Sequence, residues 1–182
     1  MVKRFLSIQK KNHSELTKTL SIALNKILSD TKNNPIQSKR INEVGNKIEQ
    51  IIEKKLKEFQ LNVEKPTTIK GNFKSTGYPD LKLSYNNEDF YIECKIFSKN
   101  SIDSSFRSFY LSPSKDFKIT SNGYHFIIAF EIETNQNLSN ATSWKILDTY
   151  NLLCDVKYEF NSNNKRIYTD CELIAESKNC KD

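Results

Sequence analysis

The sequence predicts an α/β fold, in which a central mixed β-sheet is flanked by helices and preceded by N-terminal helices (an α+β arrangement). Three observations support this prediction. Apolar residues recur at helical spacing within the first 60 residues. The spacing then changes to short runs with the alternation of strands. One run, "GYHFIIAFEIE" at 123–133, is almost wholly apolar in its middle, which is typical of a strand at the centre of a sheet.

Two amphipathic helices are expected at the start of the chain. The first spans 14–29 with Ser14 as a suitable N-cap, and its apolar stripe consists of Leu16, Leu20, Ala23, Leu24, Ile27 and Leu28. Residues 30–37, "DTKNNPIQ", are typical of a loop. The second helix spans roughly 38–59, and its stripe consists of Ile41, Val44, Ile48, Ile51, Ile52, Leu56 and Phe59.

Strands are expected after residue 59. Short strands at 60–64 and 67–73 flank Pro66, and two longer ones at 80–85 and 89–97 flank Asn86-Asn87, a dipeptide that tolerates turn conformations. The run 142–153 is compatible either with a helix or with a strand followed by a turn. The last strands are expected at 155–160 and 167–176.

Length and composition indicate one domain over 1–182, with N-terminal helices in 1–60, a β-meander and a following helix and strand in 61–133, and a C-terminal extension in 134–182. The N-terminal segment lacks the apolar stretch of a signal peptide, and the run "FIIAF" is too short to cross a membrane. We therefore expect a cytoplasmic protein that does not bind membranes.

The chain carries a net charge of +6, and its basic residues lie mainly near the N-terminus. Residues 1–75 contain 16 Lys and Arg against 7 Asp and Glu. This imbalance favours an acidic partner such as nucleic acid. The alternative is a Lys- and Asn-rich bias of the source genome.

The hairpin around Asn86-Asn87 brings charged side chains together. Residues two apart in a strand share a face, so Glu93 and Lys95 point the same way. A two-residue turn would place Asp80 opposite Glu93, and a four-residue loop would place it opposite Lys95. Both registers put the three side chains on one face.

Two carboxylates at this spacing favour a bound cation, because otherwise one of them would resist ionisation. Mg²⁺ is commonly held by one or two carboxylates together with phosphate oxygens, and Mn²⁺ is expected to substitute for it. A lysine beside such an ion can polarise the attacking water, and the ion stabilises the charge that develops on phosphorus. The three residues therefore predict metal-assisted hydrolysis of a phosphodiester.

The pattern Pro79-Asp80, twelve residues, then Glu93-Cys94-Lys95 resembles the signature of the PD-(D/E)xK nuclease superfamily. The resemblance implies a restriction-endonuclease-like core that cleaves DNA, with Asp80 and Glu93 as metal ligands and Lys95 as the catalytic lysine. Many members also carry a glutamate on the preceding helix, and Glu49 occupies a comparable place here. The alternative for Glu49 is an ordinary solvated helix residue.

Three functions are compatible with this resemblance. The first is a type II restriction endonuclease, a homodimer that cuts double-stranded DNA at a short specific sequence and is accompanied by a DNA methyltransferase. The second is a structure-specific repair nuclease or Holliday junction resolvase. The third is a DNA-binding module without enzymatic activity. The elements added to the minimal core favour the restriction enzyme, because they offer surfaces for sequence reading and dimerisation.

Candidate DNA-binding residues lie in three polar segments. They are Lys74 and Ser75 in 69–77, Lys99, Arg107, Tyr110 and Lys115 in 99–115, and Asn163 and Arg166 in 160–168. Lysine, serine and tyrosine suit phosphate contacts, whereas asparagine and arginine can also read base edges. The alternatives are a plain polar loop for the first segment, a partly buried helix for the second and an ordinary turn for the third.

Overall fold

The computed structural model of the chain describes residues 13–101 and 115–153. Its elements, in chain order, are α1 (Ser14–Asn33), β1 (Ile36–Gln37), α2 (Ile41–Glu58), β2 (Asn62–Glu64), β3 (Leu81–Tyr85), β4 (Glu88–Phe97), the 3-10 helix η1 (Lys99–Ser101), β5 (Tyr124–Asn135) and β6 (Leu138–Asp148). They all belong to the unit Met1–Leu152, the first of two units into which the chain divides. The prediction of a single domain over the whole chain stays a prediction.

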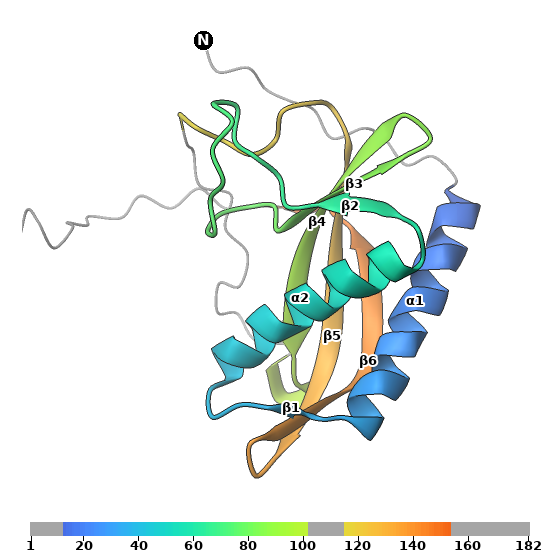
Figure 1. The fold of residues 1–182 in the computed structure, drawn as a ribbon, viewed down its shortest axis with the longest axis vertical. Coiled ribbons are helices and arrows are strands. Elements are labelled where there is room, and N and C mark those ends of the chain that lie inside the picture. The colour runs from blue at the N-terminus through green and yellow to red at the C-terminus, as the bar shows by residue number, and fades with distance from the viewer. Residues whose placement is uncertain (1–12, 102–114, 154–182) are drawn as a thin grey trace, which may run out of the picture. The chain divides into compact units, whose positions relative to one another are not determined.

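The strands form one mixed sheet in the order β1-β6-β5-β4-β3-β2 (Figure 1). Only the pair β4–β5 is parallel among the described strands, and the other neighbours are antiparallel. The strand β5 lies at the centre of this sheet, in agreement with its apolar sequence. The predicted fold class, a mixed sheet with helices in front of it in sequence, is confirmed.

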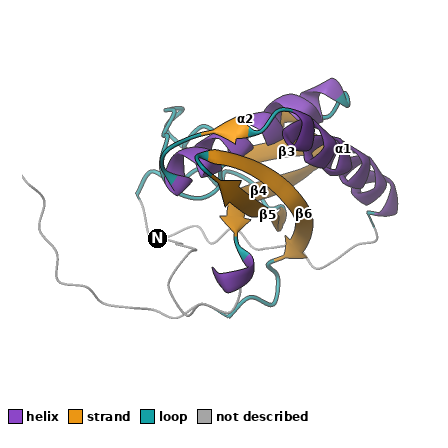
Figure 2. Cartoon of the chain, turned by 90° about the horizontal axis from the view of Figure 1, so that it is seen from below, coloured by secondary structure: helices purple, strands orange, loops and turns teal. Residues whose placement is uncertain are grey.

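Helices α1 and α2 cover the same face of the sheet (Figures 1 and 2). Helix α1 packs mainly against β6, and α2 packs against β4 and β2. The predicted helical stripes supply this layer, since Leu20, Leu24, Ile48 and Ile52 are almost fully buried. Burying each such side chain contributes about 1.5–3 kcal/mol relative to leaving it exposed. None of the helices in the described residues is both long enough and apolar enough to cross a membrane.

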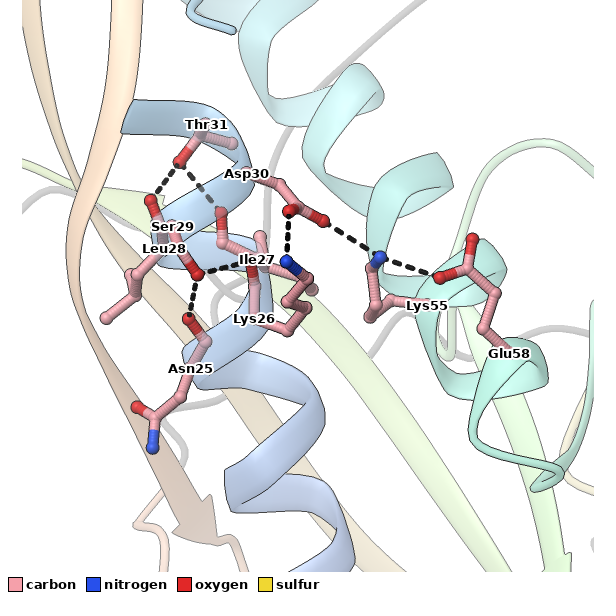
Figure 3. A network of polar contacts seen from close by, with 9 residues as sticks. All are labelled: Asn25, Lys26, Ile27, Leu28, Ser29, Asp30, Thr31, Lys55 and Glu58. Atoms are coloured by element: carbon pink, nitrogen blue, oxygen red, sulfur yellow. Dashed lines mark hydrogen bonds and ion pairs between the residues drawn. The ribbon is translucent and has the colours of Figure 1, made fainter. Parts of the chain in front are cut away.

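A polar network joins the two helices (Figure 3). The ammonium of Lys55 in α2 lies 2.8 Å from Asp30 in α1 and 2.6 Å from Glu58. Lys26 also pairs with Asp30, at 3.2 Å. Hydrogen bonding to Lys55 and Lys26 lowers the pKa of Asp30. Since the network ties helix to helix, it stabilises their packing without contributing to the sheet.

Several local predictions are wrong or are resolved by the structure. His13, and not Ser14, is the N-cap of α1, and the helix continues to Asn33. Strand β1 occupies the end of the expected loop 30–37. Residues 67–73 do not form a strand, because Gly71 adopts a positive φ of 80° and turns the chain back so that only an isolated bridge joins Thr67 to Phe73. The ambiguous run 142–153 forms most of β6 and then a turn. The strands predicted at 155–160 and 167–176 lie outside the described residues.

The hairpin β3–β4 closes through a two-residue turn. Asn86 and Asn87 have φ values of 51° and 61°, so both are in the left-handed region. This geometry is that of a type I′ turn, whose twist matches that of the flanking strands. The turn pairs Tyr85 with Glu88 and thereby sets the register of the whole hairpin.

Substitutions at Asn87 should separate backbone conformation from side-chain effects. Asn87→Ala should lower the free energy of unfolding by about 1 kcal/mol, because a left-handed conformation is costly for most L-residues. Asn87→Gly should retain or raise stability. Urea denaturation followed by Trp144 fluorescence measures both variants. An equal loss in both would mean that the asparagine side chain, and not the backbone conformation, stabilises the turn.

Candidate active site on the β3–β4 hairpin

The hairpin brings Asp80 close enough to Glu93 for the charge of Asp80 to act on the Glu93 carboxylate. Leu81 pairs with Ile92, and the preceding residue, Asp80, donates its backbone N–H to the Ile92 carbonyl at 3.1 Å. The two-residue turn therefore selects the first of the two predicted registers. On the other face of β4, Phe90 and Ile92 are fully buried under the helices. The charged face is thus held in place by an apolar one.

The carboxylate of Asp80 is fixed against β4. Its Oδ2 accepts the backbone N–H of Cys94 at 2.8 Å. Asp80 follows a tight bend in which Gly77 has a φ of 84°, a conformation that glycine adopts without strain. Pro79 is buried beside it. Because Pro79 has no N–H, the bend leaves no donor to satisfy at that position.

Glu93 and Lys95 form an ion pair on the face that they share. Lys95 Nζ lies 2.7 Å from Glu93 Oε1. Glu93 is only 8% exposed, and its second oxygen, Oε2, is buried with no hydrogen-bond partner among the described residues. A buried carboxylate oxygen without a partner is costly. Coordination of a cation by Oε2 would satisfy this oxygen.

Electrostatics at the site disfavour two negative charges. Burial raises the pKa of Glu93, and the charge of Asp80 raises it further, while Lys95 opposes the shift. Burial also raises the pKa of Asp80, with a further contribution from Glu49, and the Cys94 N–H opposes it. Carboxylates whose pKa values are raised by burial and by the charge of neighbouring carboxylates favour a cation as a binding partner.

Glu49 lies on α2, close enough for its charge to act on Asp80. Its Oε1 accepts a hydrogen bond from Lys65 Nζ at 2.8 Å, and that ion pair raises the pKa of Lys65. In this arrangement Glu49 faces a lysine. A role for Glu49 as a third metal ligand stays a prediction.

The structure adds residues that the sequence analysis did not single out. Lys118 is 5% exposed and donates to the carbonyls of Gly77 and Pro79 at 2.7 and 3.1 Å. Burial lowers the pKa of Lys118, and the charge of Asp80 opposes that shift most strongly. Lys118 stands within the sequence "DFKIT". This stretch has no helical or strand periodicity from which the burial of the lysine could have been predicted.

A second addition is the pair Tyr78 and His125. The Tyr78 hydroxyl lies 2.6 Å from His125 Nδ1, and the two rings are stacked with centroids 5.8 Å apart. Burial lowers the pKa of His125 to about 4, so the ring is neutral at pH 7. The hydrogen bond between the Tyr78 hydroxyl and Nδ1 anchors the bend before Asp80 to strand β5.

The predicted DNA-binding residues occupy different places. Lys74 Nζ donates to the Asp116 carbonyl at 2.8 Å, and Ser75 and Lys115 are exposed. Lys99 lies in η1 after β4, with its side chain 77% exposed and 3.6 Å from Glu133. Arg107, Tyr110, Asn163 and Arg166 lie outside the described residues. A DNA-binding role for all eight stays a prediction.

The residues present fit one hard divalent cation. Within the described ranges, no three acidic, histidine or cysteine side chains converge into a complete ligand set. The charge of Asp80 nevertheless acts on Glu93, and Glu93 has a buried oxygen with no hydrogen-bond partner in the part of the chain that the structure describes. Mg²⁺ sites of one or two carboxylates, completed by water and substrate phosphate, require no more from the protein.

Comparison with known proteins identifies the family. The model of the type II restriction enzyme MjaV family matches residues 2–171. The type II restriction enzyme MjaV of Methanocaldococcus jannaschii is 35% identical over 187 residues, which cover 94% of this chain and 81% of that protein. The expected resemblance to type II restriction enzymes, favoured by the elements added to the minimal core, is thus confirmed. The chain belongs to the type II restriction enzyme MjaV family.

Proposed function

We propose that this protein is a Mg²⁺-dependent type II restriction endonuclease that hydrolyses phosphodiester bonds of double-stranded DNA at a short specific sequence. The observation that carries the proposal is the Asp80 carboxylate bound to the Cys94 N–H, between Glu93 and Lys95, which form an ion pair, in a chain of the MjaV family. The three residues have the spacing and the common face expected of a PD-(D/E)xK site.

The site residues have separate roles in this proposal. Asp80 and Glu93 hold the cation, with Glu49 as a further ligand after release from Lys65. When bound by these carboxylates, a divalent cation would supply Lewis acidity for phosphodiester hydrolysis. Lys95 hydrogen-bonds the attacking water and orients it toward phosphorus. Glu93 Oε1 holds the Lys95 ammonium in place until substrate and cation arrive. Mn²⁺ is expected to replace Mg²⁺, since both prefer carboxylate oxygen ligands.

Phosphate contacts are assigned to surface residues around the site. Lys74, Ser75 and Lys115 lie in the segments that flank the bend before Asp80, and Lys99 follows the strand that carries Lys95. Arg107, Tyr110, Asn163 and Arg166, which lie outside the described residues, are proposed as further DNA contacts from the sequence alone. Affinity built on lysine and arginine contacts to phosphate falls steeply with added salt.

The proposal extends to the biological context. A homodimer would bring two hairpins to the two strands of one site, and its two-fold symmetry would match a palindromic sequence. A DNA methyltransferase with the same specificity would protect the host genome. Both proteins would act in the cytoplasm, where they meet incoming DNA.

A digest of long unmethylated DNA tests the function directly. Purified protein with Mg²⁺ should yield discrete, reproducible bands, because cleavage depends on sequence. EDTA and the variant Glu93→Gln should each abolish the bands. Sequencing of the fragment ends then gives the recognition site. Methylation of that site by the companion enzyme should block cleavage.

Other outcomes would overturn the proposal. Cleavage confined to branched or damaged DNA would assign the site to a repair nuclease. Bands that persist in both EDTA and Glu93→Gln would show that the hairpin is not the active site. Binding of duplex DNA without any cleavage, in Mg²⁺ and in Mn²⁺, would leave a DNA-binding module.

A further inference from the structure

The segment 115–121 braces the bend that delivers Asp80. Its Phe117 carbonyl accepts the N–H of Ile69, and its Asp116 pairs with Lys74. The N–H groups of Thr120 and Ser121 both donate to the Tyr91 hydroxyl, at 3.1 and 3.0 Å. Lys118 lies at the centre of this segment and is the residue that it buries most. The segment therefore contacts the polypeptide on both sides of the active-site bend.

Lys118 secures one particular peptide unit. Its ammonium donates to Pro79 O at 3.1 Å and to Gly77 O at 2.7 Å. Pro79 O and the N–H of Asp80 belong to the same planar peptide. That N–H donates to the Ile92 carbonyl on β4. The peptide before Asp80 is thus held at both of its ends, by Lys118 on one side and by the sheet on the other.

With this peptide fixed, the direction of the Asp80 side chain follows. Strand β3, which begins at Leu81, holds the backbone after Asp80, and the bond from the Cys94 N–H to Oδ2 restricts the two side-chain torsions. A lysine is suited to the task because one ammonium can donate to several carbonyls. Burying an ammonium is costly, and the nearby charges of Asp80 and Glu93 offset part of that cost. The charged state of Lys118 therefore depends on the same two carboxylates whose site it supports.

We propose that Lys118 is a positioning residue of the active site, which holds the Gly77–Pro79 backbone so that the Asp80 carboxylate stays against β4 in the geometry that a divalent cation requires. The inference rests on the proposed nuclease function for its catalytic consequence. Its structural consequence, the placement of the Asp80 carboxylate, can be measured in the cation-free protein and does not depend on cleavage.

The test compares two lysine-to-methionine variants. Lys118→Met keeps the aliphatic stem and removes the donors. Lys55→Met makes the same change at a lysine that is also largely covered, with 12% of its side chain exposed, but that joins α1 to α2 away from the hairpin. Both variants should unfold at a lower temperature. A purely structural role for Lys118 predicts that they differ in nothing else.

Hydrogen exchange of the Cys94 amide, followed by NMR in EDTA, reports on the Asp80 carboxylate. In Lys118→Met the exchange should accelerate at least about tenfold, because the acceptor is no longer held in place. In Lys55→Met it should match the parent protein once a common change in global stability is subtracted. Equal Cys94 protection in Lys118→Met and the parent protein would overturn the proposal.

Cleavage kinetics give the second readout. With saturating enzyme and Mg²⁺, Lys118→Met should cut duplex DNA about 10- to 100-fold more slowly, the effect of a misplaced active-site group. DNA affinity in Ca²⁺ should stay within about twofold of the parent value. Lys118→Arg, which retains donors and charge, should recover part of the rate. Unchanged turnover in Lys118→Met, together with faster Cys94 exchange, would refute the catalytic consequence of the proposal. An inactive parent protein would instead refute the proposed nuclease function, and the exchange result would still stand.

Discussion

Lys95→Met should lower the single-turnover rate of DNA cleavage by about 10³-fold, within the range that a positioned acid–base group contributes. Lys95 shares a face of β4 with Glu93 and lies 2.7 Å from its Oε1. Methionine retains the length of the side chain but cannot hydrogen-bond or polarise a water. The loss should therefore appear in the chemical step, measured by rapid quench with saturating enzyme and Mg²⁺.

A matched change at Lys82 controls for the loss of a lysine from this sheet. Lys82 on β3 pairs with Asp89 at 3.0 Å, and its side chain is about as covered as that of Lys95. Lys82→Met should change the rate by no more than about threefold. Duplex binding in Ca²⁺ should survive in Lys95→Met, because the proposed phosphate contacts come from other residues. A Lys95→Met protein that cleaves at the parent rate would remove Lys95 from the mechanism.

The architecture of the hairpin could be predicted from the sequence because two independent signals agree. Alternation along β4 assigns Phe90 and Ile92 to the core and Glu93 to the opposite face, and the Asn86-Asn87 dipeptide permits the tight turn. A slip of one residue would have exposed the apolar face, so burial itself enforces the register. The remaining ambiguity, a two- or four-residue loop, depended on backbone angles that the sequence leaves open.

Features that depend on contacts between distant segments could not be predicted. The partner of Glu49 is Lys65, sixteen residues away, and the support of Asp80 comes from Lys118, almost forty residues further along. Neither lysine has a periodic pattern around it. The strand expected at 67–73 fails for a related reason, since Gly71 and bonds to the segment around Asp116 fold these residues into a loop. Tertiary hydrogen bonds override the local preference there.

The two acidic residues of the site should make activity and cation-free stability respond to pH in opposite ways. Holding a divalent cation requires Asp80 and Glu93 to be ionised, and burial raises the pKa of each. Cleavage should therefore decline on the acidic side at a higher pH than ordinary carboxylates would produce. Where both groups take up protons, the fall can approach about 100-fold per pH unit. Single-turnover rates between pH 5 and 8 measure this limb.

Protons and the cation compete for the same oxygens, which provides the control for this pH profile. A tenfold higher Mg²⁺ concentration should move the acidic limb to lower pH, because metal binding releases those protons. A limb that stays in place at all Mg²⁺ concentrations would mean that a group other than Asp80 or Glu93 titrates. DNA affinity in Ca²⁺ over the same pH range separates the loss of catalysis from a loss of substrate binding.

The stability of the cation-free protein should change in the reverse direction. A carboxylate whose pKa is raised on folding binds more protons in the folded state, so its contribution is fully present below its unfolded pKa and is lost as pH rises through the folded one. In EDTA, Asp80→Asn and Glu93→Gln should therefore raise the melting temperature at pH 7 while they abolish cleavage. Glu53→Gln, which removes a carboxylate paired with Lys57 on α2, should not raise it. A lower melting temperature in both active-site variants would show that hydrogen bonds such as that from the Cys94 N–H stabilise the protein more than the burial and repulsion of the carboxylates destabilise it. A higher melting temperature would show that the protein gives up stability to keep two charged carboxylates available for a cation.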